Sequence, residues 1–352
     1  MKLHLLRRPA TALFAALLVP ACGGGGGGGG GAPAPFQVIF RSPAADATNV
    51  ARTAIVYVKF SRAADPTTVT ETNFFLTSAG NPVPAAVSYS ACNFMASLTP
   101  SAPLGAAATC TVNLTSALTD TGGAPLAPET FSFTTGNFSD TTLPTFSGVS
   151  SATAASATSV NLSWSAATGE SSPVVYDIFV STTSGCFNFG DPDQTTPAGA
   201  TGATVTGLVP NTTYYFAVRA RDAEENSDRN TVQASAKTLV SWSLNVWPVV
   251  QNNCRSCHVS GQGSLQVPNM IMTDATATRA AWINVDPSCT GGSIPAGAKR
   301  VVPGDPAQSF VYNKISQVTP WCGDRMPRGQ PALSPVNIQL FFDWIDQGAL
   351  DN

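Results

Sequence analysis

Short runs of alternating apolar and polar residues, separated by turn-forming residues, fill the chain from residue 36 to residue 239. Because successive side chains of a strand point to opposite faces, a period of two predicts strands that each bury one face. The clearest runs are 54–61, 73–78, 86–90, 109–116, 130–135, 159–168, 174–182 and 213–221. Short strands at this spacing predict all-β sandwiches over this part of the chain.

Residues 36–138 resemble a bacterial Ig-like domain of the surface-layer type. The resemblance rests on the pattern F-S-x-x-x-D-P-x-T-V at residues 60–69 and on F-S-F-T-T at residues 131–135. Cys92 and Cys110 fall in successive predicted strands, and in an exported domain we expect a Cys92–Cys110 disulfide. Two buried thiols are the alternative.

Residues 139–239 resemble a fibronectin type III domain. Leu208, Pro210 and Tyr214 match the family's region between strands E and F, and Trp164 stands where the family keeps its core tryptophan. The resemblance implies a spacer or a binding module without catalysis. The acidic residues of the next loop are expected to be solvated, with a calcium site as the alternative: Asp222, Glu224, Glu225 and Asp228.

The N-terminus predicts export. A basic segment is followed by an apolar segment that is too short to span a membrane, and Ala21 then precedes Cys22. This order resembles a bacterial lipoprotein signal, which implies that residues 1–21 are removed and that Cys22 is lipidated. An ordinary secretory signal with an incidental cysteine is the alternative.

Nine consecutive glycines follow Cys22 and cannot contribute to a core, so residues 22–35 are predicted to be a flexible tether. We therefore expect a protein of the cell envelope that a lipid anchor holds at the outer membrane, on its periplasmic or its surface face. Only 11% of the residues are charged and the net charge is −3, which excludes the electrostatic footprint of a nucleic-acid-binding protein.

The sequence changes character in residues 240–352, which hold five of the six tryptophans and show helical spacing of apolar residues. The clearest predicted helix begins after Ser334 as N-cap, has Pro335 at its first position and ends before Gly348. Its buried stripe is predicted to consist of Ile338, Phe341, Phe342 and Ile345.

Residues 254–258 read C-x-x-C-H, and we expect them to lie on a helix that begins near residue 243. On a helix, Cys254 and Cys257 share one face, and His258 lies beside them. Two thiols at this spacing can form thioethers with the two vinyl groups of one haem, and the imidazole then lies next to the iron. A zinc site, a redox-active dithiol and a chance match are the alternatives.

Zinc requires four ligands, so Cys289 or Cys322 would have to supply the fourth. We expect these two cysteines to form a Cys289–Cys322 disulfide instead, because exported cysteine pairs are usually oxidised. Cys186 is then left without an assigned role.

His258 is the only histidine after the signal segment, so a second histidine cannot bind the iron and the sixth ligand must be methionine or a weaker group. The stretch C-G-D-R-M-P-R-G before the last predicted helix resembles cytochrome c domains of environmental bacteria. The resemblance implies that Cys254 and Cys257 bind the porphyrin, that His258 is the proximal ligand and that Met326 is the distal ligand. Met270 and Met272 are expected to be apolar packing.

The predicted fold class is therefore multidomain, with two all-β Ig-like sandwiches followed by a mainly α, cytochrome c-like domain in residues 240–352. The predicted function is electron transfer by one covalently bound haem c, between redox partner proteins that the sequence does not identify. No catalytic residue is predicted. A haem enzyme, such as a peroxidase or an oxidoreductase subunit, and a surface adhesion protein with a secondary haem domain are the alternatives.

Overall fold

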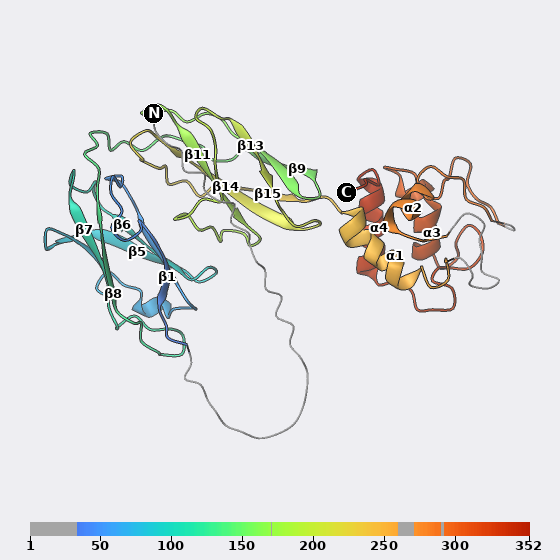
Figure 1. The fold of residues 1–352 in the computed structure, drawn as a ribbon, viewed down its shortest axis with the longest axis horizontal. Coiled ribbons are helices and arrows are strands. Elements are labelled where there is room, and N and C mark those ends of the chain that lie inside the picture. The colour runs from blue at the N-terminus through green and yellow to red at the C-terminus, as the bar shows by residue number, and fades with distance from the viewer. Residues whose placement is uncertain (1–33, 170, 260–270, 290–291) are drawn as a thin grey trace, which may run out of the picture. The chain divides into compact units, whose positions relative to one another are not determined.

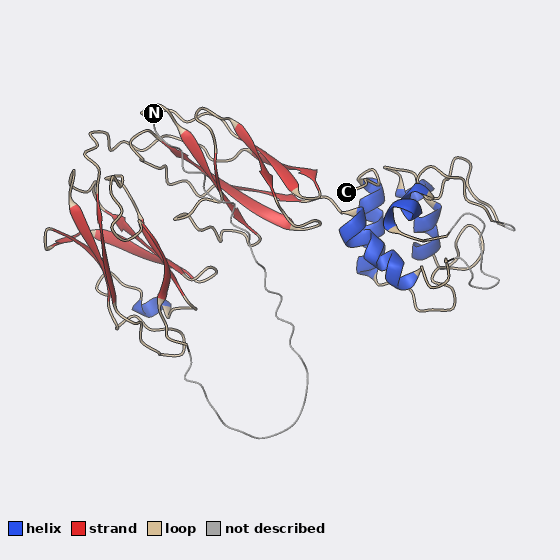
Figure 2. Ribbon diagram, in the orientation of Figure 1, coloured by secondary structure: helices blue, strands red, loops and turns tan. Residues whose placement is uncertain are grey.

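The structure is a computed structural model that describes residues 34–169, 171–259, 271–289 and 292–352. Two groups of antiparallel strands come first along the chain, and helices follow (Figure 1, Figure 2). The predicted signal peptide, Cys22, most of the tether and Met270 lie outside the described residues. Within the described ranges, no helix is both long enough and apolar enough to cross a membrane.

The first sandwich consists of two antiparallel sheets, with strand orders β1-β2-β6-β5 and β4-β3-β7-β8. Its strands are β1 (Val38–Ser42), β2 (Val56–Phe60), β3 (Phe74–Ser78), β4 (Asn81–Val83), β5 (Ala85–Ser90), β6 (Met95–Pro100), β7 (Thr109–Leu114) and β8 (Glu129–Thr134), with a 3₁₀ turn, η1 (Pro66–Thr68). In β2, Val56, Val58 and Phe60 are fully buried, whereas the residues between them are partly exposed. The alternation read from the sequence therefore corresponds to the inner and outer faces of the sheet.

The second sandwich has sheets of order β13-β10-β9 and β12-β11-β14-β15. Its strands are β9 (Ser151–Ser156), β10 (Ser159–Ser163), β11 (Val175–Ser181), β12 (Gln194–Thr195), β13 (Gly202–Thr206), β14 (Thr213–Arg221) and β15 (Gln233–Lys237). Trp164 is buried against Tyr176, with 5.4 Å between the ring centroids. The hydroxyl of Tyr214 accepts a hydrogen bond from the Val209 N–H at 2.9 Å. Both aromatic residues thus have the core positions that the sequence resemblance implies.

The cysteines of the two sandwiches pair differently from the prediction. Cys92 forms a disulfide with Cys186, with 5.9 Å between their Cα atoms, so the predicted Cys92–Cys110 disulfide is wrong. The physical reason is that Cys110 points inward from β7 and is fully buried, whereas Cys92 lies in the turn between β5 and β6. Cys186, to which the sequence assigned no role, therefore links the second sandwich to the first. Next to this disulfide, Asn93 Nδ2 donates a hydrogen bond to the Phe187 carbonyl at 2.9 Å.

The helical segment contains η2 (Trp242–Val246, a π-helical turn), α1 (Trp247–Asn253), α2 (Ala275–Ala280), the 3₁₀ turn η4 (Pro306–Gln308), α3 (Phe310–Ser316) and α4 (Pro335–Asp346). Three tryptophans form the centre of its core: the ring centroid of Trp242 lies 4.7 Å from that of Trp344 and 5.6 Å from that of Trp282. These large rings supply much of the buried apolar area of a segment whose helices are short.

The last helix, α4, has the ends that the sequence predicts. Ser334 Oγ accepts a hydrogen bond from the Asn337 N–H at 3.2 Å, and Pro335 occupies the first turn. Gly348 follows the helix with φ of +94°, a left-handed conformation that glycine adopts without strain. Of the predicted stripe, Phe341 and Ile345 are fully buried and Ile338 and Phe342 only partly.

Candidate cofactor site

The C-x-x-C-H motif lies directly after a helix and not within it. α1 ends at Asn253, and Cys254 has non-helical backbone angles. The chain then continues in tight turns, in which the Cys257 N–H donates to the Cys254 carbonyl at 3.2 Å and the His258 N–H donates to the Arg255 carbonyl at 3.1 Å. The expectation of a continuous helix through the motif is therefore wrong, because residues 254–258 form i to i+3 hydrogen bonds.

A cavity of about 340 Å³ opens beside this motif. Its wall includes Cys254, Cys257, His258 and Met326, the four residues that the sequence assigns to one cofactor. Apolar side chains form much of the remaining wall: Met272, Trp282, Phe310, Val311, Ile315 and Phe341. The fold thus brings together residues about seventy positions apart along the chain, in surroundings that suit a large apolar group.

Met272 is a wall residue that sequence reasoning missed, because it was expected only to pack in the core. It does pack there, being 3% exposed, and it also lines the cavity. Its N–H donates to the His258 carbonyl at 2.6 Å, which connects the two segments on either side of residues 260–270. No spacing in the sequence indicates this contact.

The predicted Cys289–Cys322 disulfide is present, with 6.3 Å between the Cα atoms. Cys289 lines the cavity, and Cys322 precedes Met326 by four residues. The disulfide therefore ties the segment that leads to Met326 to a second part of the cavity wall.

The electrostatic surroundings of the motif keep its first thiol protonated. Burial, reinforced by the neighbouring Cys257, raises the pKa of Cys254 to about 11. Burial also lowers the pKa of Lys314, which lines the cavity. Asp324 and Arg328 at the wall form an ion pair of 2.7 Å, with both side chains more than half exposed.

One buried donor in the cavity wall has no partner among the described residues. Trp282 is 1% exposed, and its Nε1–H makes no hydrogen bond. A buried N–H without an acceptor costs free energy, on the order of 1–3 kcal/mol. Trp282, a residue of the cavity wall, therefore has a buried donor without a partner among the described residues.

The zinc alternative would need a fourth ligand beside Cys254, Cys257 and His258. Among the residues that it describes, no group of three or more His, Cys, Asp or Glu side chains is arranged to hold a metal ion. Both cysteines that could have supplied the fourth zinc ligand, Cys289 and Cys322, are joined in the disulfide.

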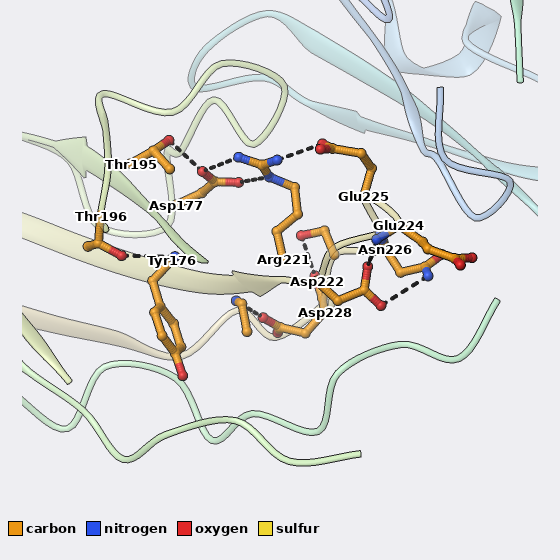
Figure 3. Close-up of polar contacts among 12 residues, drawn as sticks. Tyr176, Asp177, Thr195, Thr196, Arg221, Asp222, Glu224, Glu225, Asn226 and Asp228 are labelled. Atoms are coloured by element: carbon orange, nitrogen blue, oxygen red, sulfur yellow. Dashed lines mark hydrogen bonds and ion pairs between the residues drawn. The ribbon is translucent and has the colours of Figure 1, made fainter. Parts of the chain in front are cut away.

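Two of the four acidic residues in the acidic loop of the second sandwich, Asp222 and Asp228, are buried, contrary to the expectation of a solvated loop, whereas Glu224 is partly exposed and Glu225 is exposed. Figure 3 shows their polar contacts. Asp222 is 2% exposed, and its carboxylate accepts from the N–H groups of Glu224 at 2.9 Å and Asn226 at 2.8 Å. Asp228 is also buried, whereas Glu225 pairs with Arg221 at 2.6 Å. These carboxylates stabilise the turn through hydrogen bonds and ion pairs within the protein.

Arg221 also pairs with Asp177 at 2.7 Å (Figure 3). Burial disfavours the charge of the guanidinium, but the hydrogen bonds and charges of Asp177 and Glu225 outweigh it and raise the pKa of Arg221. This ion-pair network joins strands β11 and β14 to the loop after β14.

Comparison with known families identifies the two sandwiches. The family model of the bacterial Ig-like domain matches residues 32–135, and that of the fibronectin type III domain matches residues 144–237. No curated protein matches the chain.

Solved structures similar to parts of the chain include CopC from Methylosinus trichosporium OB3b, at 16% identity and a TM-score of 0.25, covering 29% of this chain and 93% of that one. Domains 1–6 of the surface layer protein SbsC are 16% identical with a TM-score of 0.27, and the match covers 59% of this chain but only 26% of SbsC. FN3tt is 25% identical with a TM-score of 0.22, covering 28% of this chain and 96% of FN3tt. From the two family models, the chain carries a bacterial Ig-like domain followed by a fibronectin type III domain.

Proposed function

We propose that the protein is an exported, lipid-anchored c-type cytochrome that carries one covalent haem and transfers electrons between partner proteins. The observation that carries the proposal is the single cavity whose wall includes Cys254, Cys257, His258 and Met326. The bound haem would supply a one-electron Fe(III)/Fe(II) couple.

The residues of the cavity fit this group. Cys254 and Cys257 would attach the porphyrin, while His258 and Met326 would bind the iron from the wall. The apolar side chains of the wall would exclude water from the bound group. His258 and Met326 would together hold the iron, and iron held by a histidine and a methionine favours electron transfer over activation of a substrate.

The two sandwiches would then act as spacers or interaction modules between the haem and the membrane. The predicted lipidated Cys22 and the glycine tether support attachment at the outer membrane. In cells fed a labelled fatty acid, we expect label on the wild-type chain and none on Cys22→Ser. Equal labelling of both would contradict the anchor and leave haem binding unaffected.

The haem proposal is tested by producing the full chain together with haem-attachment machinery. We expect one covalent haem on the peptide that contains residues 254–258, found by mass spectrometry, and sharp absorption bands after reduction. Cys254→Ser combined with Cys257→Ser should lose the haem, whereas the control Cys110→Ala, at a buried thiol outside the site, should keep it. A wild-type protein without haem absorption would overturn the proposal.

A further inference from the structure

The segment that carries Met326 is fastened to helix α3 at several points. Asn313 Oδ1 accepts a hydrogen bond from the Trp321 N–H at 2.9 Å, and the Lys314 carbonyl accepts from the Met326 N–H at 2.8 Å. Residues 321–326, the methionine loop, are thus bonded at both ends to two consecutive residues of one helix.

The side chain of Lys314 bonds to the loop between these two ends. Its Nζ donates to the Cys322 carbonyl at 2.8 Å and also to the Asp324 carbonyl. Gly323 lies between these acceptors with φ of +64°, and a Cβ there would lie 3.4 Å from Nζ. The loop therefore turns closely around the ammonium, which donates to two backbone carbonyls of the loop.

We propose that Lys314 is a positioning residue that holds the methionine loop closed around its ammonium and so keeps Met326 at the wall of the cavity. The charge matters as well as the length, because an ammonium is a stronger donor to carbonyls than a neutral group. An apolar side chain of similar length would remove both hydrogen bonds to the loop. This role of Lys314 rests on the proposed function only for its effect on iron ligation.

Hydrogen exchange of the full chain tests the role without haem. In Lys314→Met, we expect the amides of residues 322–326 to exchange about tenfold faster than in the wild type, as for the loss of hydrogen bonds from a charged donor. Lys314→Arg should restore part of the protection, because a guanidinium can also donate to carbonyls. The matched control is Lys299→Met, since Lys299 is also partly buried but pairs with Asp286 at 2.5 Å, and it should leave the loop unchanged.

Unchanged exchange of the loop in Lys314→Met would overturn the role of Lys314. Should that variant fail to fold, Lys314→Gln is the substitute, and the loop amides should again exchange faster than in the wild type. In the wild type itself, the Met326 amide should be protected from exchange. An unprotected Met326 amide in the folded wild type would also overturn it.

The haem-loaded protein gives a second readout. Cyanide should bind the ferric form of Lys314→Met about tenfold faster than the wild type, because opening of the methionine loop would expose the iron. Equal rates with haem attached would contradict the effect of Lys314 on ligation. Absence of haem from every variant and from the wild type would count against the proposed function, while the exchange experiment would still decide the role of Lys314.

Discussion

Met272 and Met326 both line the cavity but differ in their surroundings. Met272 is 3% exposed and belongs to the tryptophan-rich core, whereas Met326 is partly exposed at the end of a loop. A methionine that is packed on most sides contributes buried area, while one at a loop can present its sulfur to a ligand. We therefore expect Met326 to bind the iron and Met272 to stabilise the core.

Substitution by alanine separates these two roles. Met326→Ala should convert the ferric haem from low spin to high spin, with a smaller loss of stability than Met272→Ala because Met326 is only partly buried against the core. Met272→Ala should remain low spin but lower the free energy of unfolding by about 2–5 kcal/mol, as for other buried methionines. Absorption spectra and urea unfolding measure the two effects. A high-spin Met272→Ala beside a low-spin Met326→Ala would reverse the assignment.

The ion pair of Asp120 with Arg62 is expected to make the stability of the first sandwich depend on pH. The hydrogen bond from Arg62, followed by the one from the Ala124 N–H, holds the pKa of Asp120 below its ordinary value of 3.8. A carboxyl with a lowered pKa in the folded state stabilises the protein above its ordinary pKa, and this contribution disappears as the pH falls through the folded pKa.

We expect Asp120→Asn to melt at a lower temperature than the wild type at neutral pH, with the difference shrinking below pH 3.8. Calorimetry of the full chain over a pH series measures this difference. The control is Glu71→Gln, at an exposed position of the same sandwich. A difference that stays constant down to acid pH would show that the charge of Asp120 is not what stabilises the loop.

Among the elements, α4 is the one whose two ends and buried face the sequence predicts most fully. Its N-cap can be tested alone, because Ser334 is exposed and its Oγ bonds to one N–H of the helix. Ser334→Ala should lower the free energy of unfolding of the helical segment by about 1 kcal/mol, and Ser334→Asp should retain the cap. Tryptophan fluorescence reports on this segment, since five of the six tryptophans lie in it. Equal stability of the alanine and aspartate variants would contradict the cap.

At the scale of the whole molecule, the Cys92–Cys186 disulfide joins the two sandwiches covalently. The order of residues along the chain does not predict this link, because the two cysteines are 94 positions apart. Thr53 Oγ1 and Asn226 Oδ1, 2.7 Å apart, and Arg219 and Tyr57, 3.2 Å apart, add hydrogen bonds between the same two sandwiches.

A protease site inserted in residues 139–144 makes this link measurable. After cleavage, the two halves should remain together on a non-reducing denaturing gel and separate on a reducing one. Cys92→Ser should separate without reductant, whereas Cys110→Ser should behave as the wild type. Separation of the cleaved wild type without reductant would contradict the pairing.

The sequence by itself determined the strands with the clearest alternation, such as β2 and β14, because the period of two follows directly from strand geometry, but it did not mark others, such as β1 and β6. It also determined the caps of α4, because a cap depends on residues a few positions apart. It also singled out Cys254, Cys257, His258 and Met326 as one candidate site. The tertiary structure alone decided which cysteine faces Cys92, that Asp222 is buried and that Met272 reaches the cavity. These features depend on which surfaces meet when distant segments pack, and neither spacing nor composition specifies that packing.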